Sequence, residues 1–590
     1  MRIGAGLLGP RVGSRLGSAL TSPWLLAAVV VLCFFWRLGG VPLYDLDEGA
    51  FTEATREMVT SGNWITPHKD GEPRYDKPVL IYWAQAASTK LFGFNEFALR
   101  LPSALAASLW VLALWVFVRE RLDAPTATVA GLVMALSLQV SLIAKAAVAD
   151  ALLNLFIALA FFEIYRFYAQ AAPQSQTGPD PARRFVWRAY LWMGLGFLTK
   201  GPVAVFFPVL VSLLFFWSEG ALQRWMKAAL APLGWLIFVL VAGPWYLAIY
   251  LDDGAGFFES FFLKHNAGRF GGAMHGHSGF FGYYLVMLPV ILLPFTGWFL
   301  RLLPRFRSAW ADPLDRYLWI WFGVVFLFFS FSGTKLPHYL LYGCAPLFIL
   351  MARHRDLLAD GVRWRWLAFV PPLLLLAALL ALPWVIGIAE SQSQKVHEIA
   401  LFEEGRAALD SAYLAWVLAG LAATAGLALW TRAAVWQRLI LAGLVQTLVV
   451  YGVLVPRVLE VMQGPVKEAA LLARRMDLPT VVFRTSMPSF SVYRNAVTRD
   501  RIPRPGELVF LRVDKLPQLE RELPDLSQEL IYRRGPVAPA PRRPPGSEPG
   551  PPGSGAARPR HASTVQAPPW PRDLPAPRRD RPNPARLGPP

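Results

Sequence analysis

Apolar runs long enough to cross a lipid bilayer recur along this chain, from about residue 23 to about residue 455. A membrane-spanning helix needs roughly 20 consecutive apolar residues. The runs are continuous and do not alternate between apolar and polar residues, which favours helices over the strands of a membrane barrel. With 55% hydrophobic residues, the chain is too apolar for a soluble multidomain protein. These features predict an all-α polytopic membrane protein.

Basic residues mark one side of the predicted membrane. Arg and Lys gather in short connections after every second run, whereas the other connections are acidic or mixed. Because basic loops stay in the cytoplasm, the pattern predicts about thirteen spans, with the N-terminus inside and the C-terminus outside. In a bacterium this places the protein in the inner membrane, with its outer loops in the periplasm. The same distribution accounts for the net charge of +18 without a nucleic-acid partner.

Composition divides the chain into four segments. Residues 1–22 precede the first run and are expected in the cytoplasm, and residues 23–455 are expected to form the membrane domain, with a first outer loop at 41–78. Residues 456–535 contain a helical pattern followed by two β-rich runs, which predicts a small α/β domain in the periplasm. Residues 536–590 are rich in Pro, Gly and Arg and are predicted to be disordered.

The first outer loop concentrates charged residues beside the membrane. A carboxylate cluster of Asp45, Asp47 and Glu48 stands near its start, and its end contains Arg74, Tyr75, Asp76, Lys77 and Pro78. Charged groups next to a hydrocarbon layer are costly unless they are hydrated, paired or functional. We therefore expect this loop to form the floor of an active site. A plainer interpretation stays open, in which the acidic pair caps a helix over residues 49–60 and Lys77 anchors at the interface.

The predicted topology brings further polar residues to the same membrane face. Carboxylates mixed with cations suit a reaction on a phosphorylated substrate, because cations hold the phosphate while a carboxylate acts as a base or metal ligand. The chain has no P-loop, no G-x-S-x-G elbow and no Rossmann glycine pattern, so no nucleotide cofactor is expected. A lipid-phosphate-linked sugar already in the membrane is the natural activated substrate. The additional residues are Lys145, Asp150, Lys200, Lys264, His265, Asn266, Arg269, Thr334, Lys335, His338 and Tyr339.

Five motifs follow one another between about residues 20 and 350: LYDLDEGAFTEATREMVTSGNWITPHKDGEPRYDKPVLIYW, AKAAVADALLNLF, FLTKGP, FFLKHNAGRF and SGTKLPHYLL. In this order they resemble the ArnT-like lipid A aminoarabinose transferases and the bacterial relatives of protein O-mannosyltransferases, within the GT-C superfamily. The resemblance implies a GT-C transmembrane fold with periplasmic juxtamembrane helices and a small C-terminal periplasmic α/β domain.

The resemblance also implies a reaction. It is an inverting transfer of a sugar from a polyprenyl (undecaprenyl) phosphate donor to lipid A or another envelope glycolipid at the periplasmic face. Transfer to Ser or Thr of a protein remains an alternative acceptor reaction. A lipid or solute transporter is a second alternative, although that class needs charges near the bilayer midplane. The expected partners are the lipid-linked donor, the acceptor and the surrounding membrane lipids.

The resemblance assigns the catalytic and phosphate-binding roles residue by residue. Asp47 matches the catalytic aspartate of the family, and Asp150 matches its second acidic position. Glu48 stands beside Asp47 and is expected to share the catalytic role. Lys77 and Arg269 match residues that bind the donor phosphate.

The remaining matches concern the donor pocket and a metal ion. Tyr339 matches a tyrosine of the donor pocket, and Lys200 and Lys335 are expected to contact substrate. His265 and Asp76 match a pair that can share a divalent ion, for which zinc, magnesium and manganese are the candidates.

Three positions in the first loop depart from the family pattern. Ala50 and Phe51 stand where the aminoarabinose transferases have Arg and Tyr, so a cation and a hydroxyl are lost, and Asp76 replaces a Glu. These departures leave the glycosyltransferase prediction in place and leave the sugar and the acceptor open.

Overall fold

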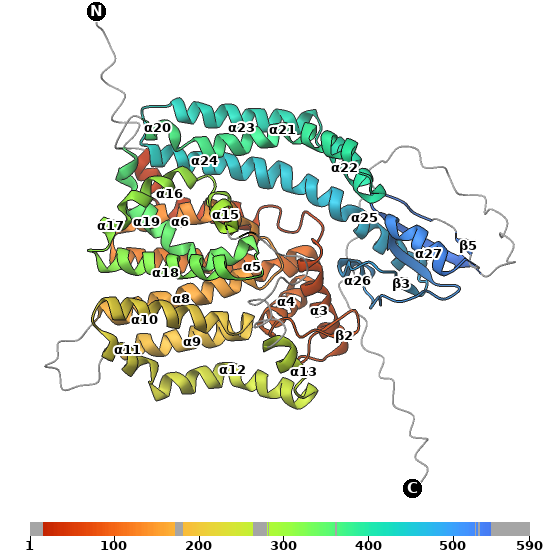
Figure 1. The fold of residues 1–590 in the computed structure, drawn as a ribbon, viewed down its shortest axis with the longest axis horizontal. Helices are drawn as coiled ribbons and strands as arrows, with labels where there is room; N and C mark the ends of the chain where they lie inside the picture. Colours follow the sequence, from red (N-terminus) through yellow and green to blue (C-terminus); the bar gives the residue numbers. More distant parts are fainter. Residues whose placement is uncertain are drawn as a thin grey trace, which may run out of the picture.

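The computed structural model of the 590-residue chain describes residues 16–170, 181–262, 280, 282–359, 363–524, 527–528 and 531–543. It consists of a bundle of helices with a small sheet-containing module packed at one end (Figure 1). The bundle helices are α2 (Pro23–Phe35), α5 (Glu96–Arg121), α6 (Ala124–Leu136), α7 (Leu138–Ala144), α8 (Asp150–Ala169), α9 (Arg183–Lys200), α10 (Val203–Ser218), α12 (Pro232–Asp253), α15 (Tyr283–Ile291), α16 (Thr296–Leu302), α18 (Pro313–Phe331), α19 (Ala345–Arg353), α21 (Val370–Gln392), α23 (Ser411–Leu429) and α24 (Val435–Val449).

Several of these helices have a polar N-cap side chain that follows a short connection. The side chain of Asn95 accepts from the backbone N–H of Ala98 (2.9 Å) at the start of α5, and Asp123 accepts from the N–H of Thr126 (2.7 Å) at the start of α6. Such caps satisfy backbone donors that have no partner inside the helix. Shorter helices connect or cover the bundle: α11 (Leu222–Ala229), α13 (Gly256–Phe258), α17 (Phe306–Ala309), α20 (Trp364–Leu367) and α22 (Val396–Ala408).

The membrane prediction is confirmed in its main point. Within the described ranges, 7 helices are long and apolar enough to cross a membrane, or up to 9 if each of two bent pairs is one span. The bent pairs are α6 with α7 (71°) and α15 with the segment that starts at Thr296 (117°). Two shorter apolar helices, α2 and α10, accompany them. The chain is therefore a multi-pass helical membrane protein.

Aromatic side chains fill the centre of the bundle. Phe117 of α5 stacks on Phe162 of α8 with ring centroids 4.4 Å apart, and Phe161 stacks on Trp321 of α18 at 4.0 Å. Buried rings of this size contribute much of the packing energy between helices. The packing holds the first residue of α8, Asp150, in a fixed position at the end of the bundle.

The first outer loop folds into defined elements at that same end. Helix α3 (Asp47–Ser61) is followed by the two-stranded hairpin of β1 (His68–Lys69) and β2 (Glu72–Pro73), and then by α4 (Leu80–Phe92). Figure 1 shows these elements beside the C-terminal module, and we call this region the α3 end of the bundle. The helix expected over residues 49–60 is thus present and begins two residues earlier.

The helix α25 (Val455–Met476) carries the chain from the bundle into the C-terminal module. A π-helical turn (Val450–Leu454) joins it to α24, so the domain boundary predicted at residue 456 falls inside a continuous helix. Pro456 has no N–H to donate to the carbonyl four residues earlier. That carbonyl, on Gly452, instead accepts from Nη1 of Arg37 (2.8 Å).

The C-terminal module contains the predicted helix and strands. Its sheet has the order β3-β4-β6-β5, with β3 (Thr480–Val482) parallel to β4 (Leu508–Arg512), and β6 (Val537–Arg543) antiparallel to both β4 and β5 (Ser527–Gln528). Helices α26 (Ser489–Arg494) and α27 (Leu516–Glu522) complete it. The rings of Phe490 and Phe510 stack at 3.9 Å and tie α26 to the sheet.

Strand β6 corrects the predicted start of the disordered tail at residue 536. Two prolines in this strand argued against sheet structure, because Pro cannot donate to a ladder. The register places Pro539 opposite Phe510 and Pro541 opposite Leu508. The polar backbone groups of both partners face β3 instead: Phe510 accepts from Phe483 N–H (2.9 Å), and Leu508 N–H donates to Pro479 (2.8 Å). The prolines therefore occupy positions where β4 requires no N–H donor.

Candidate functional site

Asp47 is an exposed carboxylate in the first turn of α3. The N-terminal end of a helix carries partial positive charge, which favours an ionised carboxylate there. The charge of Asp47 also acts on the pKa of His338, whose neighbours include Lys77 and Lys200. Asp47 thus belongs to the same electrostatic group around His338 as the cationic residues that the sequence assigned to the site.

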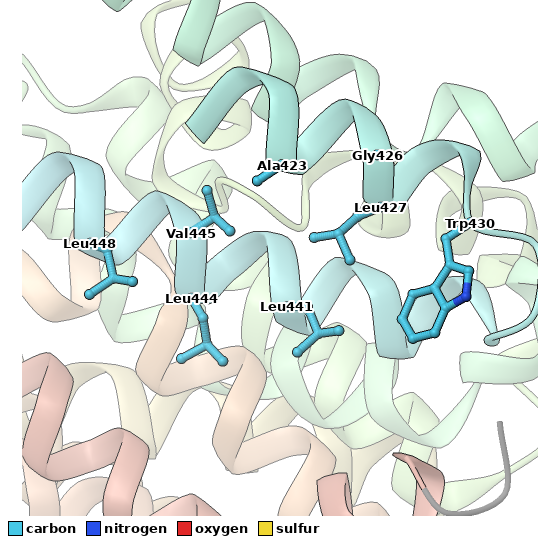
Figure 2. Close-up of a pocket in the computed structure, with 8 residues that line it drawn as sticks. All are labelled: Ala423, Gly426, Leu427, Trp430, Leu441, Leu444, Val445 and Leu448. Atoms are coloured by element: carbon cyan, nitrogen blue, oxygen red, sulfur yellow. The ribbon is translucent and has the colours of Figure 1, made fainter. Parts of the chain in front are cut away.

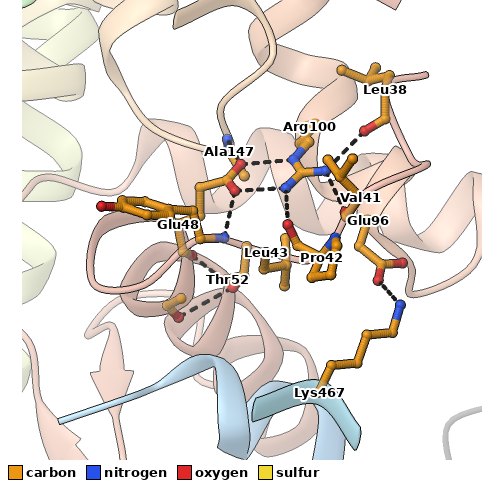
Figure 3. Close-up of polar contacts among 12 residues, drawn as sticks. Leu38, Val41, Pro42, Leu43, Glu48, Thr52, Glu96, Arg100, Ala147 and Lys467 are labelled. Atoms are coloured by element: carbon orange, nitrogen blue, oxygen red, sulfur yellow. Dashed lines mark hydrogen bonds and ion pairs between the residues drawn. The ribbon is translucent and has the colours of Figure 1, made fainter. Parts of the chain in front are cut away.

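Glu48 does not fit the catalytic role that the sequence predicts for it. The residue is 4% exposed, and Arg100 of α5 donates to both of its oxygens, from Nε (2.8 Å) and Nη2 (2.7 Å). The backbone N–H groups of Ala147 (2.6 Å) and Tyr44 (2.9 Å) also donate to it. Four accepted hydrogen bonds leave no oxygen for a substrate, as Figure 3 shows for the contacts with Arg100 and Ala147.

Arg100 extends this pairing into the start of the first loop. Its guanidinium donates to the carbonyls of Leu38 (3.1 Å), Val41 (2.9 Å) and Pro42 (2.8 Å). A buried guanidinium is stable only when its donors are matched in this way. The Glu48–Arg100 pair therefore fixes the chain that leads into α3, and Asp47 is held beside it.

Asp150 is the centre of a second group of polar side chains. Its Oδ1 accepts from Nζ of Lys200 (2.6 Å) and from the hydroxyl of Tyr342 (3.1 Å), and lies 3.7 Å from Nε2 of His338. The residues come from α8, from the last residue of α9 and from the 3₁₀ turn Pro337–Gly343. Burial lowers the pKa of His338, although the nearby Asp150 and Asp47 charges oppose this effect.

Aromatic rings cover the ammonium group of Lys200. Its Nζ lies 5.3 Å from the ring centroid of Tyr339 and 5.7 Å from that of Tyr342. Tyr339 is buried, and its ring also contacts Phe329 (5.0 Å) and His338 (4.9 Å). Cations over aromatic faces are stabilised by the ring quadrupole. The structure thus brings the predicted residues Lys200 and Tyr339 together with Asp150.

Lys335 has contacts that differ from the predicted substrate role. Its Nζ donates to the carbonyls of Ser330 (2.8 Å) and Ser332 (2.9 Å), and lies 5.9 Å from the ring centroid of Tyr284. The residue is 7% exposed. A lysine that binds the last carbonyls of a helix stabilises its C-terminus. Lys335 is therefore a cap for α18.

Lys77 and Asp76 lie at the end of the first loop, just before α4. Nζ of Lys77 donates to the backbone carbonyl of Asp76 (2.9 Å), and the Asp76 carboxylate lies 3.6 Å from Nη2 of Arg74. Arg74 in turn lies over the ring of Phe51, 4.9 Å from its centroid. A cation is thus present beside Phe51, near the position where the sequence indicated that one was lost.

The predicted metal site is only partly within the described chain. His265 and Arg269 lie outside the described residues, together with Lys264 and Asn266. In the parts of the chain that the structure describes, no group of three or more His, Cys, Asp or Glu side chains is placed to hold a metal ion.

Sequence reasoning missed Arg100 and Tyr342, and gave His338 no role. Arg100 interrupts an apolar run, which is the signal that marks a buried, paired charge. Tyr342 lies in the SGTKLPHYLL region, three residues after Tyr339, and a tyrosine among apolar residues gives no such signal. Only the fold places its hydroxyl on Asp150.

An apolar groove lies away from these residues, between α23 and α24 (Figure 2). It has a volume of about 530 Å³ and is lined by apolar side chains that include Leu427, Trp430, Leu441 and Leu444. Exposed apolar surface of this kind is expected where membrane helices face lipid. We assign the groove no part in the chemistry.

The known proteins and the family that match this chain are all named as glycosyltransferases. The family described as dolichyl-phosphate-mannose-protein mannosyltransferase matches residues 76–247. A protein of Enterobacter sp. (strain 638), named undecaprenyl phosphate-alpha-4-amino-4-deoxy-L-arabinose arabinosyl transferase, is 30% identical over 427 residues, which are 70% of this chain and 74% of that protein. A protein of the same name from Aeromonas salmonicida (strain A449) is 33% identical over 346 residues, and the match covers 57% of this chain and 61% of that protein.

The fold is similar to a solved structure as well. The crystal structure of ArnT from Cupriavidus metallidurans bound to undecaprenyl phosphate has a TM-score of 0.72 and 20% sequence identity, and the match covers 88% of this chain and 97% of that one. At this identity the likeness establishes a shared fold. The Enterobacter match shows that the chain belongs to the family of undecaprenyl phosphate-aminoarabinose arabinosyl transferases.

Proposed function

We propose that this protein is an inverting glycosyltransferase that moves a sugar from a polyprenyl (undecaprenyl) phosphate to an acceptor at the periplasmic face of the bacterial inner membrane. The observation that carries the proposal is that the charges of Asp47, Asp150, Lys77 and Lys200 all act on one side chain, His338, at the α3 end of the bundle. The names of the relatives, which state an undecaprenyl phosphate-linked donor, support the same chemistry.

The proposed reaction separates a phosphate leaving group from the anomeric carbon of the sugar. Lys77, together with Arg269 as the resemblance implies, holds the phosphate and stabilises the charge that develops on it. Asp47 orients or deprotonates the acceptor, or stabilises positive charge on the sugar ring. The acceptor attacks on the face opposite the phosphate, which inverts the configuration. The ion pair between Asp150 and Lys200 joins α8 to α9 next to this site.

The preferred acceptor is lipid A or another envelope glycolipid. A lipid A phosphate is already a nucleophile and needs little base catalysis. A Ser or Thr hydroxyl of a protein is the second candidate. It needs a proton acceptor, and Asp47 and His338, which interact through their charges, are the groups we propose for that task. The match to a protein mannosyltransferase family favours this alternative too.

The membrane arrangement is part of the proposal. If α2, α9, α10 and α19 also cross, the count reaches about thirteen spans, with basic loops in the cytoplasm. The α3 end and the C-terminal module then lie in the periplasm. No catalytic step is assigned to a divalent ion, because Asp76, the described half of the candidate pair, is engaged by Arg74.

Transfer by the purified protein in proteoliposomes tests the proposal. Undecaprenyl phosphate-linked 4-amino-4-deoxy-L-arabinose and a mannose-linked equivalent would be offered with lipid A or with a Ser/Thr-rich peptide. Transfer of sugar to one acceptor is expected, and the productive pair identifies the substrates. Movement of the donor lipid across the bilayer with no transfer would favour the transporter alternative.

A further inference from the structure

Helix α26 of the C-terminal module donates hydrogen bonds to three acidic residues of the membrane domain. Ser491 donates to Asp70 in the β1–β2 hairpin (2.9 Å), and the hydroxyl of Tyr493 donates to Glu96 at the start of α5 (3.1 Å). The third contact is made by Ser489, whose backbone N–H donates to Oδ1 of Asp45 (3.0 Å) while its hydroxyl donates to Oδ2. The three donors are spaced two residues apart along α26.

The contact at Asp45 differs from the other two in its place in the chain. Asp45 precedes Asp47 by two residues, whereas Asp70 and Glu96 are far from it in sequence. A Cβ added at Gly49 would overlap Oδ1 of Asp45 and lie 2.8 Å from the backbone nitrogen of Ser489. The Asp45 carboxylate therefore lies in a narrow space between α3 and α26, which only a glycine at position 49 leaves open.

The position of Asp47 is consequently set by hydrogen bonds to residues on either side of it in the sequence. Glu48 is fixed by Arg100 on the side of the bundle, and Asp45 is fixed by Ser489 on the side of the module. The exposed carboxylate of Asp47 has its position set by these two neighbours, because it begins the helix that they anchor. A catalytic group needs such support to stay within a fraction of an ångström of its working position.

We propose that Ser489 is a positioning residue for the transfer reaction, acting on Asp47 through Asp45, so that the C-terminal module is a working part of the catalytic centre. This inference rests on the proposed function, in which Asp47 is the catalytic carboxylate. A merely structural α26 would dock the module equally well through Ser491 or Tyr493. Tyr493 also accepts from the N–H of Leu43 (2.7 Å), but of the three α26 side chains Ser489 is the one that contacts Asp45.

The Asp45 carboxylate also gives the contact a pH dependence. Burial raises its pKa to about 7, the two hydrogen bonds from Ser489 lower it, and the charges of Asp70 and Glu48 raise it. Ser489 donates to this carboxylate from its N–H and from its hydroxyl, and both hydrogen bonds are charge-assisted and stronger when the carboxylate is ionised. The contact is complete above this pKa and weakens as the pH falls through it. Removal of the Ser489 hydroxyl moves this transition to higher pH.

Three variants of α26 test the proposal in the transfer assay. Ser489→Ala is expected to lower kcat at least about tenfold with the donor KM unchanged, since the loss concerns orientation of a catalytic group. Ser489→Thr keeps the hydroxyl and is expected to restore most of the activity. Ser491→Ala is the matched control, because it removes the same kind of bond from the same helix but away from Asp47, and near-normal kcat is expected.

The pH profile and hydrogen exchange separate positioning from docking. In Ser489→Ala the acidic limb of kcat should move to higher pH, and exchange in residues 41–50 should increase, while exchange in the sheet of the module stays at the wild-type level. Equal losses in Ser489→Ala and Ser491→Ala, or normal kcat in Ser489→Ala, would overturn the inference. Absence of transfer by the wild-type protein would instead refute the proposed function.

Discussion

Nζ of Lys200 lies 2.6 Å from Oδ1 of Asp150, which joins the last residue of α9 to the first residue of α8. Both side chains are largely buried, with 10% and 8% exposure. An ion pair in such a place contributes little net stability, but removal of one partner leaves an unpaired buried charge and costs about 3–5 kcal/mol. The relative position of the end of α9 and the start of α8 therefore depends on both residues.

Lys200→Met is therefore expected to lower the melting temperature and the activity together. Asp150→Asn should also lower stability, because the amide does not neutralise the buried Lys200 ammonium, although its oxygen still accepts from Lys200 and Tyr342. The double variant Asp150→Asn/Lys200→Met should recover part of the stability lost in Lys200→Met, since it removes the unpaired charge. Thermal unfolding in detergent measures these differences, and additive losses would contradict the coupling.

Glu48 and Asp47 should respond differently to the same substitution. Asp47→Asn is expected to keep the wild-type melting temperature, because the side chain is exposed. Glu48→Gln removes the charge that neutralises buried Arg100 and should destabilise the protein by about 3–5 kcal/mol. Parallel measurements of melting temperature distinguish the two roles. A stable but inactive Glu48→Gln protein would restore the catalytic interpretation of Glu48.

Lys335 and Lys77 form another contrasting pair. Lys335→Met removes a cap from α18 and is expected to lower stability with the donor KM unchanged. Lys77→Met should raise the donor KM about tenfold or more with stability preserved, because a lysine on a phosphate contributes a charge-assisted hydrogen bond. Steady-state kinetics at varied donor concentration test this. A raised KM in Lys335→Met would return that residue to the substrate site.

His338 should make the protein less stable in mild acid. Burial lowers its pKa in the folded state, so the unfolded chain binds the proton more readily. Stability is then present at neutral pH and declines as the pH falls below about 6.5, the value for an unfolded histidine. His338→Gln should reduce this loss of stability in acid. The pH dependence of kcat that we assign to Asp45 should be unchanged in this variant. Melting temperatures of the wild type and of His338→Gln, measured at intervals of about half a pH unit from pH 8 to pH 5, test this difference.

The sequence was sufficient for the class of fold because apolar runs report directly on membrane crossing. Helix α3 and the strands near residues 480 and 510 were also accessible, since they carry strong local patterns, whereas the β1–β2 hairpin and α4 were not predicted. Strand β6 was not, because Pro539 and Pro541 argue against a strand unless the register is known. The start of the module was missed for a similar reason, since Pro456 suggests a break, whereas the carbonyl that Pro456 leaves without a donor is bound by Arg37 from the turn after α2.

The candidate site was predicted as a set of residues but not as a set of roles. Asp47 and Glu48 are adjacent and chemically alike, yet one is exposed and the other is paired with Arg100, 52 residues away. Lys200 and Lys335 similarly share a residue type and a membrane face, but one meets Asp150 and the other caps a helix. Such differences depend on partners distant in the chain, which a motif does not show.

The central claim is that Asp47 is the catalytic carboxylate of a lipid-linked sugar transfer. The most direct measurement is the transfer rate of Asp47→Asn in proteoliposomes, with undecaprenyl phosphate-linked sugar as donor and melting temperature as the control for folding. The rate is expected to fall at least about a hundredfold in a normally folded protein, in line with the loss of a charged catalytic group. A rate equal to that of the wild type would contradict the account.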